Sequence, residues 1–306
     1  MTATQKLMCS HSQPWMAFLF YFDAMNFILL NGIITEGDKA CIAADNSSYR
    51  YGDGLFETMK VVNGEILLAS YHFERLFAGL KVLQFAVPDF FSREKIMAEI
   101  LLLCKKNHCG QRAKVRLSVS RGSGGLYDCD NRLHYLAECL PLEKTADYLN
   151  ADGLVVDVFP DAEKSCDRFS NLKSANYLPY VMAALWAKEN KLDDALVLNQ
   201  HQRICDATIA NIFCVKNEKI FTPPLSEGCV AGVMRRLILN GRLHVADLDL
   251  KIEESLLTGA TLLDADEVFL TNAVSGIRWV KQCRNKLYSN TVTKKIFDAC
   301  LLPLYG

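Results

Sequence analysis

Hydrophobic and polar residues along the chain follow two periods, one typical of strands and one typical of helices. Apolar runs and alternations predict nine strands, and Asn63-Gly64 between two of them predicts a hairpin turn. Apolar residues at helical spacing predict six helices. The expected strands are 27–32, 55–62, 65–69, 114–120, 133–139, 154–159, 195–198, 211–215 and 219–222. The expected helices are 72–83, 93–106, 177–189, 231–239, 252–257 and 292–301.

This mixed order predicts an α+β protein with two domains, and no internal repeat interrupts it. A polar stretch at 142–151 is typical of a linker. We therefore expect an N-terminal extension at 1–24, a small α+β domain at 25–144 and a larger domain at 145–306. Loops from both domains are expected to build a cleft where the domains meet.

The composition narrows the class of function. The 306 residues are 50% hydrophobic and 23% charged, as in an ordinary soluble protein. A formal net charge of −1 gives no reason to bind nucleic acid or an anionic membrane. The apolar run from Trp15 to Leu30 is interrupted by Asp23 and is shorter than the roughly 20 residues of a membrane-spanning helix.

The twelve cysteines are scattered, and no Cys-x-x-Cys pair occurs. Cys104, His108 and Cys109 lie close together in sequence, but no second pair of ligands completes a zinc site. We expect no bound metal. Reduced, mostly buried thiols favour a cytoplasmic protein.

Two residues carry the candidate chemistry. Lys173 stands in Asn-Leu-Lys-Ser-Ala-Asn-Tyr, and Asp206 follows 33 positions later, shortly before Asn211-Ile212-Phe213. Alone, Lys173 would be a surface cation and Asp206 a turn residue. Together, an amine that forms a Schiff base and an acid that holds a pyridinium proton are the minimal equipment of pyridoxal-phosphate chemistry.

Six motifs occur in an order that resembles the fold-type-IV pyridoxal-phosphate enzymes, also called class IV aminotransferases. That family includes branched-chain and D-amino-acid aminotransferases and 4-amino-4-deoxychorismate lyase. The motifs are Tyr51-Gly52-Asp53-Gly54-Leu55-Phe56-Glu57-Thr58, His72-Phe73-Glu74-Arg75-Leu76, the lysine motif, the Asn-Ile-Phe motif, Gly232-Val233-Met234-Arg235 and Asp266-Glu267-Val268-Phe269-Leu270-Thr271-Asn272-Ala273.

The resemblance implies a role for each matching residue. Lys173 would hold the cofactor as a Schiff base and then move protons between the substrate and the cofactor. Asp206 would pair with the pyridine nitrogen, where the family usually has the longer glutamate. Arg75 would bind the cofactor phosphate, although a lone helix arginine is more often a surface residue. Tyr177 would donate to the phenolic oxygen of the cofactor, but it could equally be an aromatic residue that begins an amphipathic helix.

The remaining phosphate contacts are implied to come from the main chain. Val233 and Met234 would offer N–H groups at a helix start. Met234 stands where the family often has threonine, so a side-chain bond is lost. Asn272 and Ala273 would approach the phosphate or the substrate carboxylate through the backbone.

Features within the family favour the lyase. Thr58 stands where branched-chain aminotransferases typically have glycine, the lysine loop is one residue tighter than theirs, and the segment 120–125 resembles the lyases. Leu126 departs from the pattern, because the lyase and the D-amino-acid enzyme tend to have a carboxylate-binding arginine there. Lys60, Arg116 or Arg121 would have to supply that cation.

The leading hypothesis is a lyase that converts 4-amino-4-deoxychorismate to 4-aminobenzoate and pyruvate. A branched-chain or D-amino-acid aminotransferase is the alternative, and a catalytically silent binding protein is a third possibility. The resemblance also implies a homodimer in which partner loops lie near the site. Tyr51 would then line its own site or that of the neighbouring subunit, in contact with a small amino substrate.

Overall fold

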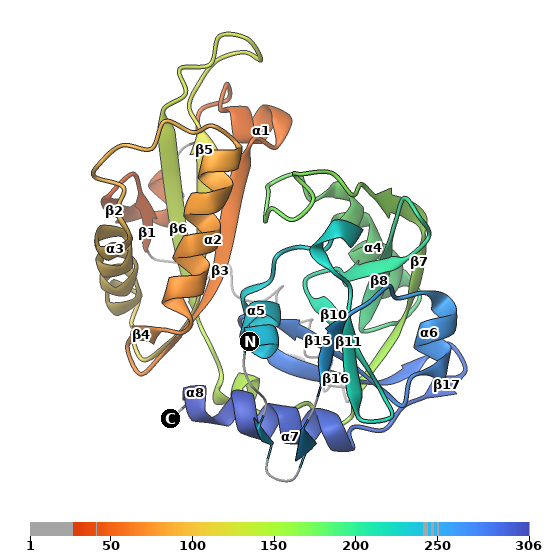
Figure 1. Ribbon diagram of the computed structural model, residues 1–306. Coiled ribbons are helices and arrows are strands. Elements are labelled where there is room, and N and C mark those ends of the chain that lie inside the picture. The colour runs from red at the N-terminus through yellow and green to blue at the C-terminus, as the bar shows by residue number, and fades with distance from the viewer. Residues whose placement is uncertain (1–26, 41, 241–243, 246–247, 250, 306) are drawn as a thin grey trace, which may run out of the picture.

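The computed structural model describes residues 27–40, 42–240, 244–245, 248–249 and 251–305, so the expected extension at 1–24 lies outside the described residues. Two β-sheets stand side by side with helices packed around them (Figure 1). This arrangement confirms the predicted α+β class. The expected domain boundary at 144/145 falls in the connecting segment, at a 3-10 turn η3 (Lys144–Asp147), and stays a prediction.

The first sheet has six antiparallel strands in the order β2-β1-β6-β5-β3-β4. Helices α2 (Ala69–Val82) and α3 (Arg93–Lys106) pack against this sheet (Figure 1). The short helix α1 (Ser47–Tyr51) lies at its upper end. The strands are β1 (Phe27–Leu30), β2 (Ile33–Glu36), β3 (Gly54–Val62), β4 (Glu65–Ile66), β5 (Arg112–Arg121) and β6 (Leu133–Pro141).

Strand β3 has two different faces, because successive side chains of a strand point to opposite sides. Leu55, Met59 and Val61 join the core beneath α2. Phe56 and Lys60 lie on the opposite face, where they contact residues of the C-terminal half of the chain. One strand therefore closes the first core and forms a wall of the space between the sheets.

The second sheet has nine strands, in the order β14-β11-β10-β15-β16-β7-β8-β9, with β17 beside β16. One apolar cluster fills one side of this curled sheet, while two others lie under its helices. The strands are β7 (Leu154–Lys164), β8 (Asp194–Asn199), β9 (Ile204–Ala207), β10 (Asn211–Lys216), β11 (Lys219–Thr222), β14 (Ile252–Glu254), β15 (Glu267–Asn272), β16 (Gly276–Cys283) and β17 (Lys286–Leu287). The hairpin β12 (His244–Val245) and β13 (Leu248–Asp249) forms a separate sheet.

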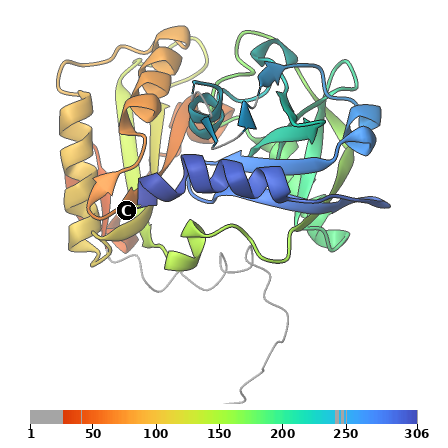
Figure 2. The same ribbon diagram turned by 60° about the horizontal axis from the view of Figure 1, so that its bottom comes forward.

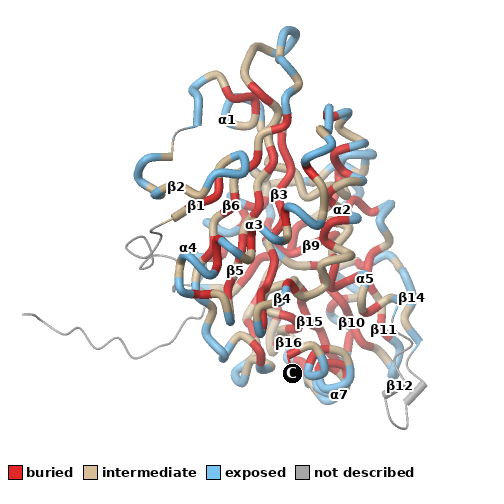
Figure 3. The backbone as a smooth tube through the Cα atoms, turned by 90° about the vertical axis from the view of Figure 1, so that its left-hand side faces the viewer, coloured by how far each residue is buried: buried red, intermediate tan, exposed pale blue. Residues whose placement is uncertain are grey.

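Five helices accompany the second sheet: α4 (Leu178–Glu189), α5 (Val233–Asn240), α6 (Gly259–Asp264), α7 (Thr291–Cys300) and α8 (Leu302–Tyr305). Figure 2 shows α7 and α8 crossing from the second sheet towards the first. Burial is concentrated in the strands, and the loops at the ends of the sheets are exposed (Figure 3). No helix among the described residues has the length and apolar character needed to cross a bilayer.

The expectation of a helix at 252–257 was wrong. Ile252–Glu254 forms β14, which pairs in parallel with β11, and the main chain on both sides of it is held by the neighbouring strand. A segment this short does not form a stable helix by itself, whereas the open edge of β11 offers it backbone hydrogen bonds. The apolar pattern also left β15 and β16 without a prediction, although both are buried strands in the middle of the second sheet.

Candidate active site

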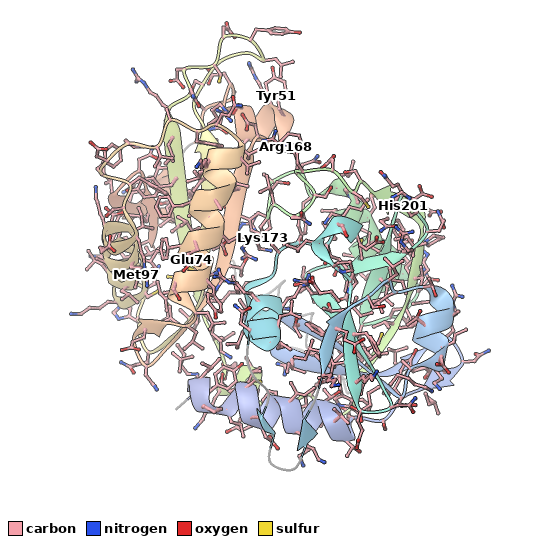
Figure 4. All side chains as sticks on the ribbon, in the orientation of Figure 1. Tyr51, Glu74, Met97, Arg168, Lys173 and His201 are labelled. Atoms are coloured by element: carbon pink, nitrogen blue, oxygen red, sulfur yellow. The ribbon has the colours of Figure 1, made fainter. Side chains whose placement is uncertain are left out.

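Lys173 lies between the two sheets, in the loop that joins β7 to α4 (Figure 4). The main chain of this loop pairs with the free edge of β3. Phe56 N–H donates to the carbonyl of Lys173 at 2.9 Å, and Ala175 N–H donates to the carbonyl of Gly54 at 2.9 Å. The loop therefore holds the lysine in a fixed position against the first sheet.

The surroundings of Lys173 favour a neutral amine. Its Nζ lies 4.3 Å from the centroid of the Phe56 ring and 5.8 Å from that of Tyr177. Burial and the charge of Arg75 lower the pKa of Lys173 from 10.5 to about 7. Only the neutral amine is a nucleophile, so a large fraction of Lys173 can react near neutral pH.

Arg75 projects from α2 and connects the two halves of the molecule. Its Nε and Nη2 donate to both oxygens of Glu57, at 2.8 and 2.5 Å, and Nη1 donates to the carbonyl of Ala231 at 2.9 Å. The ring of His72 also contacts Glu57 at 2.6 Å. Burial alone would raise the pKa of Glu57, but Arg75 and His72 outweigh it and lower this pKa to about 2.

A guanidinium has five N–H donors, of which these contacts use three. Arg75 therefore keeps two donors beside the start of α5. The first-turn N–H groups of Val233 and Met234 have no partner within their own helix and suit an anion. This combination fits the phosphate-binding role predicted for the three residues.

The chain just before α5 is tightly packed. Asn211 donates from Nδ2 to the carbonyl of Val230 at 2.8 Å, and its Oδ1 leaves no room for a side chain at Gly232, since a Cβ there would lie 1.9 Å from that atom. Thr271 pairs with Asn211 across the two strands, so the two side chains share a face. The hydroxyl of Thr271 is buried without a partner among the described residues.

Asp206 sits on β9 with 1% of its surface exposed. Its Oδ2 accepts from the hydroxyl of Tyr180 at 2.7 Å, from Nζ of Lys164 at 3.1 Å and from the N–H of Val230 at 3.0 Å. Within the described part of the chain, its Oδ1 accepts from Asn211 alone, at 2.9 Å. Oδ1 thus has one donor where Oδ2 has three, so it is the oxygen with room for a further N–H such as that of a protonated pyridine.

Tyr177 lies beside this group. Its ring stacks on Tyr180, with centroids 4.4 Å apart, and meets the edge of Phe56 at 5.4 Å. Its hydroxyl donates to the carbonyl of Thr208 at 3.0 Å. The predicted bond to a cofactor oxygen would have to replace or share this contact.

Asn272 and Ala273 lie at the turn between β15 and β16. The side-chain oxygen of Asn272 accepts from the N–H groups of Val274 and Ser275, at 3.0 and 2.8 Å. The Asn272 side chain thus shapes the turn. This agrees with the prediction that Asn272 and Ala273 would approach the phosphate or the substrate carboxylate through the main chain.

The candidate cations separate clearly in space. Lys60 has no exposed surface and pairs with Asp147 at 2.7 Å, so its ammonium is already engaged. Arg121 pairs with Asp53 at 2.7 Å near the tip of the first sheet. There it lines a pocket of about 560 Å³ together with Tyr51 and Leu126.

Arg116 is the candidate that reaches the lysine. Its guanidinium carbon lies 3.8 Å from the centroid of the Phe56 ring, which Lys173 also contacts. It is directly opposite Thr58 across strands β5 and β3, so the two share the face that looks towards the second sheet. Arg116 and Lys173 thus both contact the Phe56 ring, and Thr58 lies opposite Arg116 on the same face.

Several residues of the site were not predicted. Glu57 and Asn211 occur inside the quoted motifs, and their polar character within buried strands was the available signal. Lys164 and Tyr180 gave no signal, because only the fold brings them to Asp206.

The chain is similar to known proteins over most of its length. A model of the family described as amino-transferase class IV matches residues 54–283. Aminodeoxychorismate lyase of Vibrio harveyi is 30% identical over 233 residues, which cover 75% of this chain and 83% of that protein. D-alanine aminotransferase of Listeria monocytogenes is 24% identical, with 80% of this chain and 83% of that protein covered.

Among solved structures, the branched-chain aminotransferase of Thermoproteus uzoniensis with norvaline superposes with a TM-score of 0.79 at 23% identity. The match covers 92% of this chain and 95% of that one. This likeness agrees with the two-sheet architecture described above. Since the family model also spans most of the sequence, the chain belongs to the class IV aminotransferases, and the fold-type-IV pyridoxal-phosphate enzyme expected from its motifs is confirmed.

Proposed function

We propose that this enzyme is a lyase that converts 4-amino-4-deoxychorismate to 4-aminobenzoate and pyruvate. The observation that carries the proposal is one group of residues, in which Arg116 and Lys173 contact the Phe56 ring and Thr58 lies directly opposite Arg116. It offers a hydroxyl and a guanidinium to a carboxylate-bearing substrate beside the reactive amine. Aminodeoxychorismate lyases of Vibrio harveyi and Bacillus subtilis, at 30% and 29% identity, support the same choice.

Pyridoxal phosphate, when bound, supplies an electron-withdrawing ring that accepts the charge left when a proton leaves the substrate carbon. The chain would hold this group at both ends. Lys173 would bind it covalently, and the free position on Asp206 Oδ1 would accept the N–H of its ring. Arg75 and the start of α5, with Val233 and Met234, would bind its phosphate.

Once a substrate has displaced it, the amine of Lys173 would take the proton from the substrate carbon. Its pKa of about 7 suits this task, because a base with a pKa near the working pH is both free to accept a proton and able to return it. Phe56 and Tyr177 exclude water from the amine. Arg116 would bind a carboxylate of the substrate, and Thr58 would orient the atoms next to the reacting carbon.

An aminotransferase is the second candidate. The same residues can return the proton to a different carbon, and D-alanine aminotransferase of Listeria monocytogenes is among the relatives. Leu126 stands where the lyase and the D-amino-acid enzyme tend to have a carboxylate-binding arginine, so this departure favours a branched-chain aminotransferase within this candidate class.

We also propose a cytoplasmic homodimer. Helix α4 exposes Leu178, Val181, Met182 and Leu185, whose spacing places them on one face of the helix. An exposed apolar row of this kind supports a protein interface. Tyr51, exposed at the tip of the first sheet, would lie near the partner's site or its own. The ten described cysteines are free thiols, which supports a reducing compartment.

Two assays run in parallel test the activity. The first measures pyruvate released from 4-amino-4-deoxychorismate, and the second measures keto-acid formation from leucine and from D-alanine with 2-oxoglutarate. We expect pyruvate release to dominate. Keto-acid formation without pyruvate release would replace the lyase by the aminotransferase.

The substrate contact is tested with Arg116→Gln. We expect KM to rise by at least about tenfold, the effect of losing a charge-assisted bond, because the carboxylate would lose its cation. Arg132→Gln, on an exposed arginine just before β6, is the matched control and should leave KM unchanged. Equal KM values for the two variants would remove Arg116 from the substrate site.

A further inference from the structure

Three cysteine thiols meet in the core of the first sheet, on the side away from Lys173. Cys104 lies near the end of α3, Cys109 in the turn that follows it and Cys139 on β6, and all three are buried. Their sulfur atoms all lie within 4.8 Å of one another, and Cys109 and Cys139 are 3.6 Å apart at Sγ. The proposed catalytic role uses none of them.

The chain around the cluster holds the thiols in place. Cys109 N–H donates to the carbonyl of Cys104 at 2.9 Å, and His108 adopts a left-handed conformation with φ of 57° that turns the chain back towards the sheet. Asn107 donates from Nδ2 to the sulfur of Cys139 at 3.2 Å. An N–H donor directed at a sulfur stabilises its thiolate form, as groups around metal-bound thiolates do.

We propose that Cys104, Cys109 and Cys139 form a site for a divalent thiophilic cation of the zinc class. A zinc–sulfur bond is about 2.3 Å long, so three sulfurs around one ion lie about 4.0 Å apart. The observed sulfur cluster reaches this geometry with shifts of less than about 1 Å.

The chemistry of the ligands and the charge select the type of ion. Three sulfurs, with no His, Asp or Glu of the described residues joining them, exclude the hard cations that need oxygen ligands. A divalent ion leaves one net negative charge on three thiolates, whereas a monovalent ion leaves two. The smaller net charge costs less desolvation free energy in an apolar core. Binding would release up to three protons, so the affinity rises with pH.

A disulfide is the competing use of the same thiols. A sulfur–sulfur bond is about 2.05 Å long, so Cys109 and Cys139 would have to approach by about 1.5 Å and would leave Cys104 unused. The ion needs smaller movements and uses all three thiols. It would join α3 to β6 and stabilise the first sheet.

Cadmium is the probe, because its thiolate complexes absorb in the ultraviolet. The reduced, full-length holoenzyme is titrated with Cd²⁺, and the bound metal is counted by elemental analysis after gel filtration. We expect the Cys104→Ala/Cys139→Ala variant to bind one Cd²⁺ per chain fewer than the wild type. The single Cys139→Ala variant should bind at least about tenfold more weakly. Cys214→Ala, at an equally buried thiol of the second sheet, is the control and should match the wild type.

A second measurement does not depend on the folding of the variants. Wild-type protein is alkylated with and without Cd²⁺, and the modified peptides are identified by mass spectrometry. Protection of the peptides with Cys104, Cys109 and Cys139 is expected. Equal alkylation in both samples, equal Cd²⁺ counts in wild type and double variant, or a Cys109–Cys139 disulfide in place of bound Cd²⁺ would each overturn the proposal.

Discussion

At the scale of single residues, the reactivity of Lys173 comes from its neighbours. Burial and the nearby charge of Arg75 make the protonated amine costly. Asp206 is held in the opposite way, by four donors that stabilise its negative charge. The amine is thus kept ready to be neutral, and the carboxylate is fixed in position for the N–H of the cofactor ring.

The pH dependence of covalent cofactor binding tests the environment of Lys173. Below pH 7 the amine is protonated and cannot attack an aldehyde, so the rate of binding should rise as pH increases through about 7 and level off above it. The rate is followed by the absorbance of pyridoxal phosphate added to the cofactor-free protein. Borohydride reduction and peptide mass spectrometry should place the cofactor on Lys173. A midpoint near 10, as for an exposed lysine, would contradict the account.

Substitution of Asp206 by Asn tests its charge. We expect the cofactor to bind at least about tenfold more weakly, because a hydrogen bond to a charged group is worth about 1.5–3 kcal/mol. Lys164→Met is the matched control, since it removes one partner of Asp206 and leaves the carboxylate in place. Dialysis followed by absorbance measures the cofactor retained. Equal loss in both variants would mean that the ion pair, rather than the carboxylate itself, is needed.

At the scale of secondary-structure elements, the start of α5 depends on a close approach between two segments. Asn211 on β10 contacts the segment before the helix, and that segment is also bound by Asp206 and Arg75. The N–H groups expected to bind phosphate are therefore positioned by the same residues that would hold the ring and the phosphate. A shift of the helix start would disturb the whole site.

Gly232→Ala tests this element. The added Cβ would overlap Asn211, whose amide is fixed by two hydrogen bonds, so the helix start must move at a cost of about 1–3 kcal/mol. We expect weaker cofactor binding, measured by retained absorbance, and a lower Tm. Gly259→Ala, at the start of α6 with nothing within 4 Å of the new Cβ, is the control and should change neither quantity. Unchanged cofactor binding in Gly232→Ala would show that the close contact is not required.

At the scale of the whole molecule, a buried ion cluster holds the two sheets together. Lys60 of β3 and Arg112 of β5 both contact Asp147 in the connecting segment, and Lys60 also faces the ring of Tyr305 in α8. The first sheet, the connecting segment and the C-terminal helix therefore meet at one carboxylate. The relative position of the walls around Lys173 depends on this contact.

Asp147→Asn is expected to lower the free energy of unfolding by about 3–5 kcal/mol, because it leaves buried cations without a counter-charge. Burial and the charges of Arg112 and Arg278 lower the pKa of Lys60 to about 7, so the loss should be largest below pH 7, where Lys60 is charged. Urea denaturation at pH values on both sides of 7 measures it. Asp161→Asn, at an exposed carboxylate, is the control. A loss that does not vary with pH would contradict the role of Lys60.

The sequence by itself determined most of the helices and strands, since the burial of one face leaves a period in the chain that needs no knowledge of distant contacts. It also determined the family, because Lys173, Asp206 and the motifs around them keep a fixed order and spacing. The strands at 252–254, 267–272 and 276–283 and the contacts that Lys60 makes could not be found in this way.

Tertiary structure decided which residues meet. Arg116, rather than Lys60 or Arg121, reaches the ring that Lys173 touches, because β5 pairs with β3 in one register. Cys139 joins two thiols that are 30 and 35 positions away only because β6 lies beneath α3. The physical reason is the same in each case. The position of a side chain along its own strand or helix is local, but its neighbours depend on how the sheets pair and how the two halves of the molecule pack together.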